Sequence, residues 1–143
     1  MTIASVLARK GSDVFTVEQS ERVEAAVALL ADRRVGALPV MDGGRIAGIF
    51  SERDLLYGIR KEGPAFVSRR LSEAMTTPAV TARPDTGVIE ALATMTRRRI
   101  RHLPVVDSSG ALVGVVSIGD LVKFRIDGME AETRAMRDYI TTA

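Results

Sequence analysis

Cysteine and tryptophan are absent from this sequence of 143 residues, and histidine occurs once, as His102. The lack of cysteine excludes disulfides, thiolate metal sites and cysteine nucleophiles. A single histidine cannot supply the spacing of a histidine metal site, and it leaves little for acid–base or nucleophilic catalysis. We therefore expect no enzyme, no metal ion and no catalytic residues.

The sequence also lacks an apolar run of the roughly 18 residues that a membrane-spanning helix needs. Residues 1–10 do not follow the charged-then-apolar order of a secretory signal peptide. We expect a cytoplasmic protein that has no membrane partner.

Neither sign of charge dominates, because 20 Lys and Arg residues face 18 Asp and Glu residues, for a net charge of +2. The one dense basic run, Arg97–His102, is typical of a solvated helix end. Four Phe and two Tyr provide few stacking groups, so nucleic acid is not an expected partner. Apolar residues, in contrast, make up 46% of the chain, which is enough for a folded core.

An internal repeat organises the sequence. Residues 14–42 align without a gap on residues 79–107, and after one inserted residue 44–55 align on 110–121. Fifteen of the 41 aligned positions are identical. Self-similarity of this kind indicates a duplicated structural unit.

The first half of each copy is predicted to be a strand followed by a helix. Residues rich in β-branched side chains mark the strand at 14–17 and at 80–81. Apolar residues at i, i+3, i+4 and i+7 mark the helix, with Ser20 and Asp85 as its expected N-caps.

The second half of each copy is predicted to be a hairpin followed by another helix. Turn residues separate two apolar runs at 37–50 and again at 102–116, a pattern typical of a β-hairpin. The second helix is expected to begin at Ser51 in one copy and at Ser117 in the other.

One copy of about 45 residues is too small to close a core, so the two copies are expected to pack together. The expected fold is mixed α/β, with two pseudo-symmetric β-α-β-β-α repeats packed through their sheets and short extra helices at both termini. The expected segments are an N-terminal helix with repeat 1, a structured linker, repeat 2 and a C-terminal helix: 1–62, 63–78, 79–126 and 127–143.

Two motifs recur in the same order in both copies. Leu-Pro-Val-x-Asp occupies residues 38–42 and 103–107, and Gly-x-x-Ser-x-x-Asp-Leu occupies residues 48–55 and 114–121. This tandem arrangement closely resembles the CBS domain. The resemblance covers roughly residues 3–126, so the chain looks like a stand-alone CBS pair, or Bateman module.

The resemblance implies a homodimeric module that binds an adenosine-containing ligand such as AMP, ATP or NAD(H) between its repeats. A helix N-terminus suits phosphate, and a carboxylate can accept hydrogen bonds from both ribose hydroxyls. The sequence positions that match the ligand residues of the family, together with arginines able to reach phosphate, are Thr16, Gly36, Ala37, Ser51, Arg53, Asp54, Thr81, Arg99, Arg101, His102, Ser117 and Asp120. Gly36-Ala37 stands where the second copy has Arg101-His102, so the two sites are expected to differ.

Two hypotheses about function stay open. In the first, an adenine nucleotide shifts the packing of the dimer and changes a surface that an unknown downstream protein reads. In the second, the chain is a ligand-independent interaction subunit, and its Ser-x-x-Asp motifs are helix capping boxes. An apolar stripe over 129–140 is expected to serve dimer packing or to dock on the chain's own core.

Overall fold

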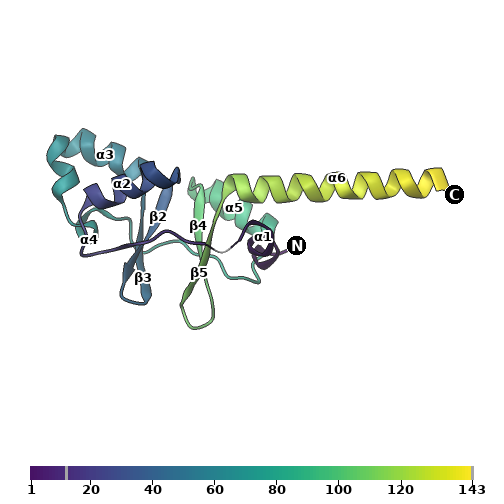
Figure 1. The fold of residues 1–143 in the computed structure, drawn as a ribbon, viewed down its shortest axis with the longest axis horizontal. Coiled ribbons are helices and arrows are strands. Elements are labelled where there is room, and N and C mark those ends of the chain that lie inside the picture. The colour runs from purple at the N-terminus through teal and green to yellow at the C-terminus, as the bar shows by residue number, and fades with distance from the viewer. Residues whose placement is uncertain (12, 143) are drawn as a thin grey trace.

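The computed structural model describes residues 1–11 and 13–142. They form two lobes with separate hydrophobic cores, and a long helix projects from one lobe (Figure 1). Each lobe contains one of the two expected hairpins together with helices that cover it. The mixed α/β architecture of two repeats is confirmed.

The first lobe contains a three-stranded sheet in the order β1-β2-β3. Strand β1 runs parallel to β2, and β2 pairs antiparallel with β3. Its elements are β1 (Val17–Glu18), α2 (Val23–Arg33), β2 (Ala37–Asp42), β3 (Arg45–Ser51), α3 (Glu52–Glu62), the 3-10 helix η1 (Gly63–Ser68) and α4 (Leu71–Ala74). Phe50 of the sheet is fully buried and stacks on Phe66 of η1, with the ring centroids 6.5 Å apart.

The second lobe contains the antiparallel hairpin of β4 and β5. Its elements are α5 (Val88–Arg98), β4 (His102–Val106), β5 (Leu112–Ser117) and α6 (Ile118–Thr142). In place of a third strand, Ala82 makes a single parallel bridge to Val105. This bridge is the repeat counterpart of the Val17–Val40 pair in the first lobe.

Each lobe is covered by the helix that precedes the other repeat. The N-terminal helix α1 (Ile3–Lys10) buries Ile3 and Val6 in the core of the second lobe. Leu71 of α4, which precedes the second repeat, is buried in the core of the first lobe. The helix expected beside the first repeat in sequence therefore packs against the second repeat in space.

Two repeat-related glycines allow this crossed packing. A Cβ atom on Gly48 would lie 2.6 Å from the Thr76 carbonyl oxygen, and one on Gly114 would lie 2.8 Å from Leu7 Cδ2. At Gly48 the clash would be with the backbone, so this close approach requires glycine, whereas at Gly114 the flexible Leu7 side chain would have to move aside.

The beginnings of the repeats differ from the sequence prediction. Strand β1 holds only Val17 and Glu18, and residues 80–81 form no strand. Helices α2 and α5 have Arg22 and Gly87 as N-caps, so the prediction of Ser20 and Asp85 was wrong.

Backbone contacts replace the expected side-chain caps at both helices. The Val23 N–H donates to the Arg69 carbonyl over 2.8 Å, and the Val88 N–H donates to the Met1 carbonyl over 3.2 Å. In each case the covering segment from the other repeat supplies the acceptor, which a motif within one repeat cannot reveal.

The C-terminal region also differs from the prediction. One continuous 25-residue helix, α6, joins the second helix of repeat 2 to the separate C-terminal helix that was expected. Gly128 lies within it without ending it. Among the described residues, no helix combines the length and the apolar character that crossing a membrane requires.

Candidate functional site

Two cavities lie between the lobes, and we name them after the carboxylate that each contains. The Asp54 cavity has a volume of about 540 Å³ and the Asp120 cavity about 390 Å³, within the range of small-molecule sites. The Asp54 cavity is lined by residues that include Ser51, Arg53, Asp54, Tyr57, Thr76, Val80, Arg101 and His102. The Asp120 cavity is lined by residues that include Lys10, Asp13, Phe15, Arg34, His102, Val115, Ser117 and Asp120.

The crossed packing of α1 and α4 decides which segments line each cavity. Residues that follow α4, from Thr76 to Val80, reach the Asp54 cavity of the first lobe. Lys10 at the end of α1 and the later residues Asp13, Val14 and Phe15 reach the Asp120 cavity of the second lobe. Each cavity is therefore built from both repeats, and neither repeat could form one alone.

A capping box holds Asp54 at the N-terminus of α3. The Ser51 N–H donates to Asp54 Oδ2 over 2.9 Å, and the Asp54 N–H donates to Ser51 Oγ over 3.4 Å. The Thr76 hydroxyl donates to the other carboxylate oxygen, Oδ1, over 2.9 Å. Hydroxyl donation to Oδ1 is the type of contact that a ribose would make.

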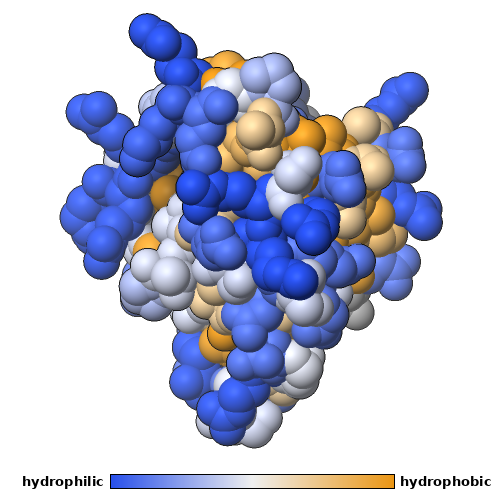
Figure 2. Space-filling model, turned by 90° about the vertical axis from the view of Figure 1, so that its left-hand side faces the viewer, coloured by the Kyte–Doolittle hydropathy of each residue, from blue (hydrophilic) through white to orange (hydrophobic). Residues whose placement is uncertain are grey.

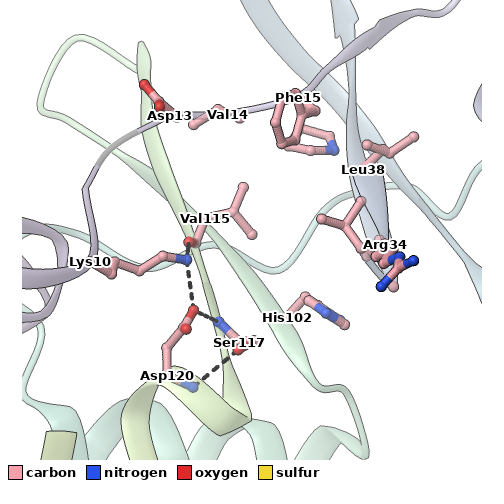
Figure 3. Close-up of a pocket in the computed structure, with 14 residues that line it drawn as sticks. Lys10, Asp13, Val14, Phe15, Arg34, Leu38, His102, Val115, Ser117 and Asp120 are labelled. Atoms are coloured by element: carbon pink, nitrogen blue, oxygen red, sulfur yellow. Dashed lines mark hydrogen bonds and ion pairs between the residues drawn. The ribbon is translucent and has the colours of Figure 1, made fainter. Parts of the chain in front are cut away.

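Asp120 is held in the same way at the start of α6, but its neighbour is a cation. The Ser117 N–H donates to Asp120 Oδ2 over 2.9 Å, and the Asp120 N–H donates to Ser117 Oγ over 3.1 Å. Lys10 Nζ lies 2.7 Å from the same Oδ2 and also donates to the Val115 carbonyl over 2.9 Å (Figure 3). The two cavities therefore present their carboxylates in different states, one beside a hydroxyl and the other in an ion pair.

The pKa of Asp120 reflects this ion pair. Burial raises the pKa of the carboxyl, but the hydrogen bond and charge of Lys10 and the hydrogen bonds from Ser117 more than offset it. The net pKa lies below the ordinary value for aspartate, so Asp120 is ionised at neutral pH.

His102 belongs to a wall that the two cavities share. Gly36, Ala37 and His102 line both of them, and a Cβ atom on Gly36 would lie 2.9 Å from His102 Cε1. Burial lowers the pKa of His102, and the nearby carboxylates Glu52 and Asp120 offset this only in part. The imidazole is therefore neutral at pH 7.

Arginine side chains contribute unequally to the two cavities. Arg53 and Arg101 line the Asp54 cavity, and Arg34 lines the Asp120 cavity. Arg53 Nη1 donates to the Arg99 carbonyl over 2.8 Å, which ties α3 to the second repeat. Arg99 itself follows α5 with a left-handed backbone conformation, as Arg34 does after α2.

Nine of the twelve predicted site residues lie at the cavities. Seven of them line the Asp54 cavity: Gly36, Ala37, Ser51, Arg53, Asp54, Arg101 and His102. Ser117 and Asp120 line the other cavity, together with Gly36, Ala37 and His102. Thr16, Thr81 and Arg99 are exposed and lie outside the described lining of both cavities.

Several cavity residues were not predicted from the sequence, notably Lys10, Phe15, Arg34, Tyr57 and Thr76. Arg34 had a signal, because it is identical to Arg99 in the repeat alignment. Lys10 and Thr76 had none, because both precede the aligned regions and reach a cavity only through the crossed packing.

Comparison with known proteins identifies the family. Residues 5–61 and 71–127 each match the CBS domain. The chain therefore belongs to the CBS domain family and contains two CBS domains.

Two relatives match over most of their own length. The mitochondrial CBS domain-containing protein CBSX3 of Arabidopsis thaliana is 34% identical over 148 residues, which cover 97% of this chain and 71% of the relative. The CBS domain-containing protein YhcV of Bacillus subtilis is 32% identical over 119 residues, which cover 83% and 84%. An inosine-5'-monophosphate dehydrogenase of Thermoplasma acidophilum is 34% identical, but the match spans only 21% of that enzyme. The relatives matched over most of their length are CBS domain proteins, and the enzyme matches only over a small part, so this chain is a non-catalytic module, as predicted.

Solved structures show the same fold. The CBS-domain containing protein ATU1752 of Agrobacterium tumefaciens superimposes with a TM-score of 0.83 and 36% identity, covering 87% of this chain and 99% of that one. CBSX2, solved in complex with AMP, gives a TM-score of 0.75 and 26% identity, covering 88% and 96%.

Proposed function

We propose that this CBS pair is a regulatory module that binds an adenosine nucleotide in the cavities between its lobes. The observation that carries the proposal is the repeated geometry of a carboxylate held at a helix N-terminus and facing a cavity built from both repeats. The carboxylate would accept hydrogen bonds from the ribose hydroxyls. The helix N-terminus and neighbouring arginines would attract the phosphates.

A relative of the same family supports this choice of ligand. CBSX2, with 26% identity, has been solved with AMP. AMP, ATP and NAD(H) share the adenosine part, and the cavity residues do not select among them.

The Asp54 cavity would be the tighter of the two sites. It is the larger cavity, and a ribose hydroxyl replaces the neutral Thr76 hydroxyl on its carboxylate more easily than it replaces a charged ammonium group. A ribose that enters the Asp120 cavity would compete with Lys10 for its carboxylate. The two sites would therefore fill at different ligand concentrations.

A ligand can signal only if it binds two arrangements of the protein with different affinities. In this module, the nucleotide would bridge the lobes, shift the packing of a homodimer and alter a surface that a downstream protein contacts. The competing hypothesis is a ligand-independent interaction subunit in which Asp54 and Asp120 only cap helices. Their capping hydrogen bonds are compatible with both hypotheses.

Thermal unfolding of nucleotide-stripped protein tests the proposal. AMP, ADP, ATP, NAD, NADH and GTP would be compared, each over a range of concentrations. A ligand at 100 times its dissociation constant adds about 2.7 kcal/mol, which raises the unfolding midpoint by roughly 5–11 °C at this chain length. We expect such a shift with at least one adenine nucleotide and none with GTP.

Variants separate ligand binding from helix capping. Asp54→Asn and Asp120→Asn keep a side-chain oxygen that can accept the capping hydrogen bond but lose the carboxylate. We expect near-native stability without ligand and a strongly reduced ligand shift in Asp54→Asn, whereas Asp138→Asn on exposed α6 should leave the shift unchanged. The absence of any shift in the native protein would favour the interaction subunit.

A further inference from the structure

The outer part of α6 has no packing partner within the described chain. The helix extends far beyond the second lobe (Figure 1), and every residue from Met129 to Thr142 is exposed. Isolated helices of roughly this length are marginally stable in water. A helix of this kind needs a surface to cover one of its faces.

Apolar side chains define that face. We use the term α6 stripe for Val122, Ile126, Met129, Thr133, Met136 and Ile140, which alternate at spacings of four and three residues. The five apolar members are between 42% and 66% exposed. Alternating spacings of three and four are the heptad pattern of a coiled coil. Of the α6 side chains that pack on the lobe, Leu121 and Phe124 lie on a different face of the helix, and Ile118 lies one turn before the stripe begins.

We propose that the α6 stripe packs against the α6 stripe of a second copy of this chain as a parallel, two-stranded coiled coil. The stripe is self-complementary, because its apolar positions recur at the same heptad places in both copies. Thr133 is the only polar member, and a single polar residue within an apolar seam can help to fix the register of a coiled coil.

The charges that flank the stripe favour a parallel pair. The spacings place Ile126 and Thr133 at the first (a) position of a heptad, and in a parallel coil the residue just before an a position faces the residue five places further along the partner helix. Arg125 then faces Glu130 of the second copy, and Glu132 faces Arg137 of the second copy. Each contact occurs twice by symmetry, and all four pair opposite charges.

An antiparallel pair with full overlap of the two stripes lacks this complementarity. Its midpoint falls at residue 131, so Glu130 and Glu132 of both copies come together there. Four clustered carboxylates oppose association.

The opposite end of the molecule, around α3 and α4, shows a mainly hydrophilic surface with separate apolar patches (Figure 2).

Sedimentation equilibrium of the full chain tests the interface. The variant M129E/M136E places two charges in the stripe of each helix, and we expect its dimer dissociation constant to rise about 100-fold or more. The control A131E/A135E adds the same charge on the opposite face of the same segment and should change the constant by less than about threefold. All four positions are exposed, so circular dichroism should show that both variants stay folded.

Disulfide cross-linking tests the orientation, since the natural chain has no cysteine. In the parallel coil the two copies of residue 136 face each other, so M136C should form a covalent dimer on mild oxidation. In the fully overlapped antiparallel coil the two copies lie roughly 15 Å apart along the axis, too far for a disulfide. D138C, on the outer face, is the matched control and should stay reduced under the same conditions.

Three results would overturn the proposal. The first is a native chain that stays monomeric up to about 100 μM, a concentration well above the dissociation constants of specific dimers. The second is a dimer that M129E/M136E leaves intact. The third is an M136C dimer that does not cross-link. Cross-linking of M136C together with dissociation of M129E/M136E would establish it.

Discussion

The protonation of a single residue, His102, should make stability depend on pH. Burial lowers its pKa in the folded chain, whereas the unfolded chain has the ordinary value of about 6.5. Below that value, the unfolded state therefore binds more protons than the folded state. The free energy of unfolding should fall as the pH decreases from about 6.5 toward the folded pKa, by up to about 1.4 kcal/mol per pH unit.

Urea unfolding between about pH 8 and 5, a range that brackets the ordinary histidine pKa, measures this effect. His102→Gln cannot take up the proton, so its stability should vary less over the same range. Asp120 does not interfere, because its lowered pKa places the loss of its contribution at more acidic pH, below the ordinary aspartate pKa of about 3.9. Equal pH dependence in both proteins would show that His102 is not the titrating group.

At the scale of elements, the short N-terminal helix α1 should contribute strongly to stability. Ile3 is fully buried in the core of the second lobe, although it is the third residue of the chain. Ile3→Ala should cost about 2–5 kcal/mol in the free energy of unfolding, as for other large-to-small core substitutions. Ile89→Ala, at an exposed position of α5, should stay within about 0.5 kcal/mol of the native value.

Chemical denaturation of the two variants beside the native chain provides the measurement. An Ile3→Ala protein as stable as Ile89→Ala would mean that α1 is not held on the second lobe in solution. Because α1 also supplies Lys10 to the Asp120 cavity, that result would also mean that Lys10 is not held at this cavity.

Elements that depend on contacts within one repeat could be predicted from the sequence, and elements that depend on the other repeat could not. The hairpins β2-β3 and β4-β5 follow from apolar runs separated by local turn residues, and the α3 cap at Ser51 follows from a motif four residues long. The caps of α2 and α5 come from backbone carbonyls of Arg69 and Met1, which no local pattern marks.

The candidate site divides in the same way. The carboxylates and serines lie inside the repeated motifs, and the shared wall directly precedes the two Leu-Pro-Val motifs, so their positions could be predicted. The resemblance to the CBS domain suggested Thr16 and Thr81 in the first strands, but the neighbouring residues Phe15 and Val80 line the cavities instead. Helix α6 continues past residue 126, where the resemblance ends, and through Gly128, although glycine usually weakens a helix interior, and no motif of the repeats marks this continuity.

At the scale of the whole molecule, the two cavities share a wall. Gly36, Ala37 and His102 line both of them, and Arg53 links α3 to the second repeat through the Arg99 carbonyl. We therefore expect occupancy of one cavity to change the surroundings of the other. Because the repeats are pseudo-symmetric, both cavities contain a carboxylate at a helix N-terminus. They differ in the group beside that carboxylate, which is Lys10 in one cavity and Thr76 in the other.

Lys10 should therefore set the difference in affinity between the two sites. Lys10→Met removes the cation from Asp120, so a ribose no longer has to displace an ion pair. Hydrogen bonds to charged groups are worth about 1.5–3 kcal/mol, so the second site should tighten about 10-fold or more and the two affinities should converge. The stability cost should stay below about 1 kcal/mol, because Lys10 is partly exposed.

Isothermal titration with whichever adenine nucleotide stabilises the native protein resolves the two sites. Native protein should give two unequal binding steps, and Lys10→Met should give two steps closer in affinity. Lys61→Met, an exposed lysine on α3, is the matched control and should reproduce the native isotherm, which separates the ion pair from the loss of one positive charge. A second step that weakens in Lys10→Met would mean that Lys10 binds the phosphates and assists the ligand, because a lysine that only competes for Asp120 can lower affinity but cannot raise it.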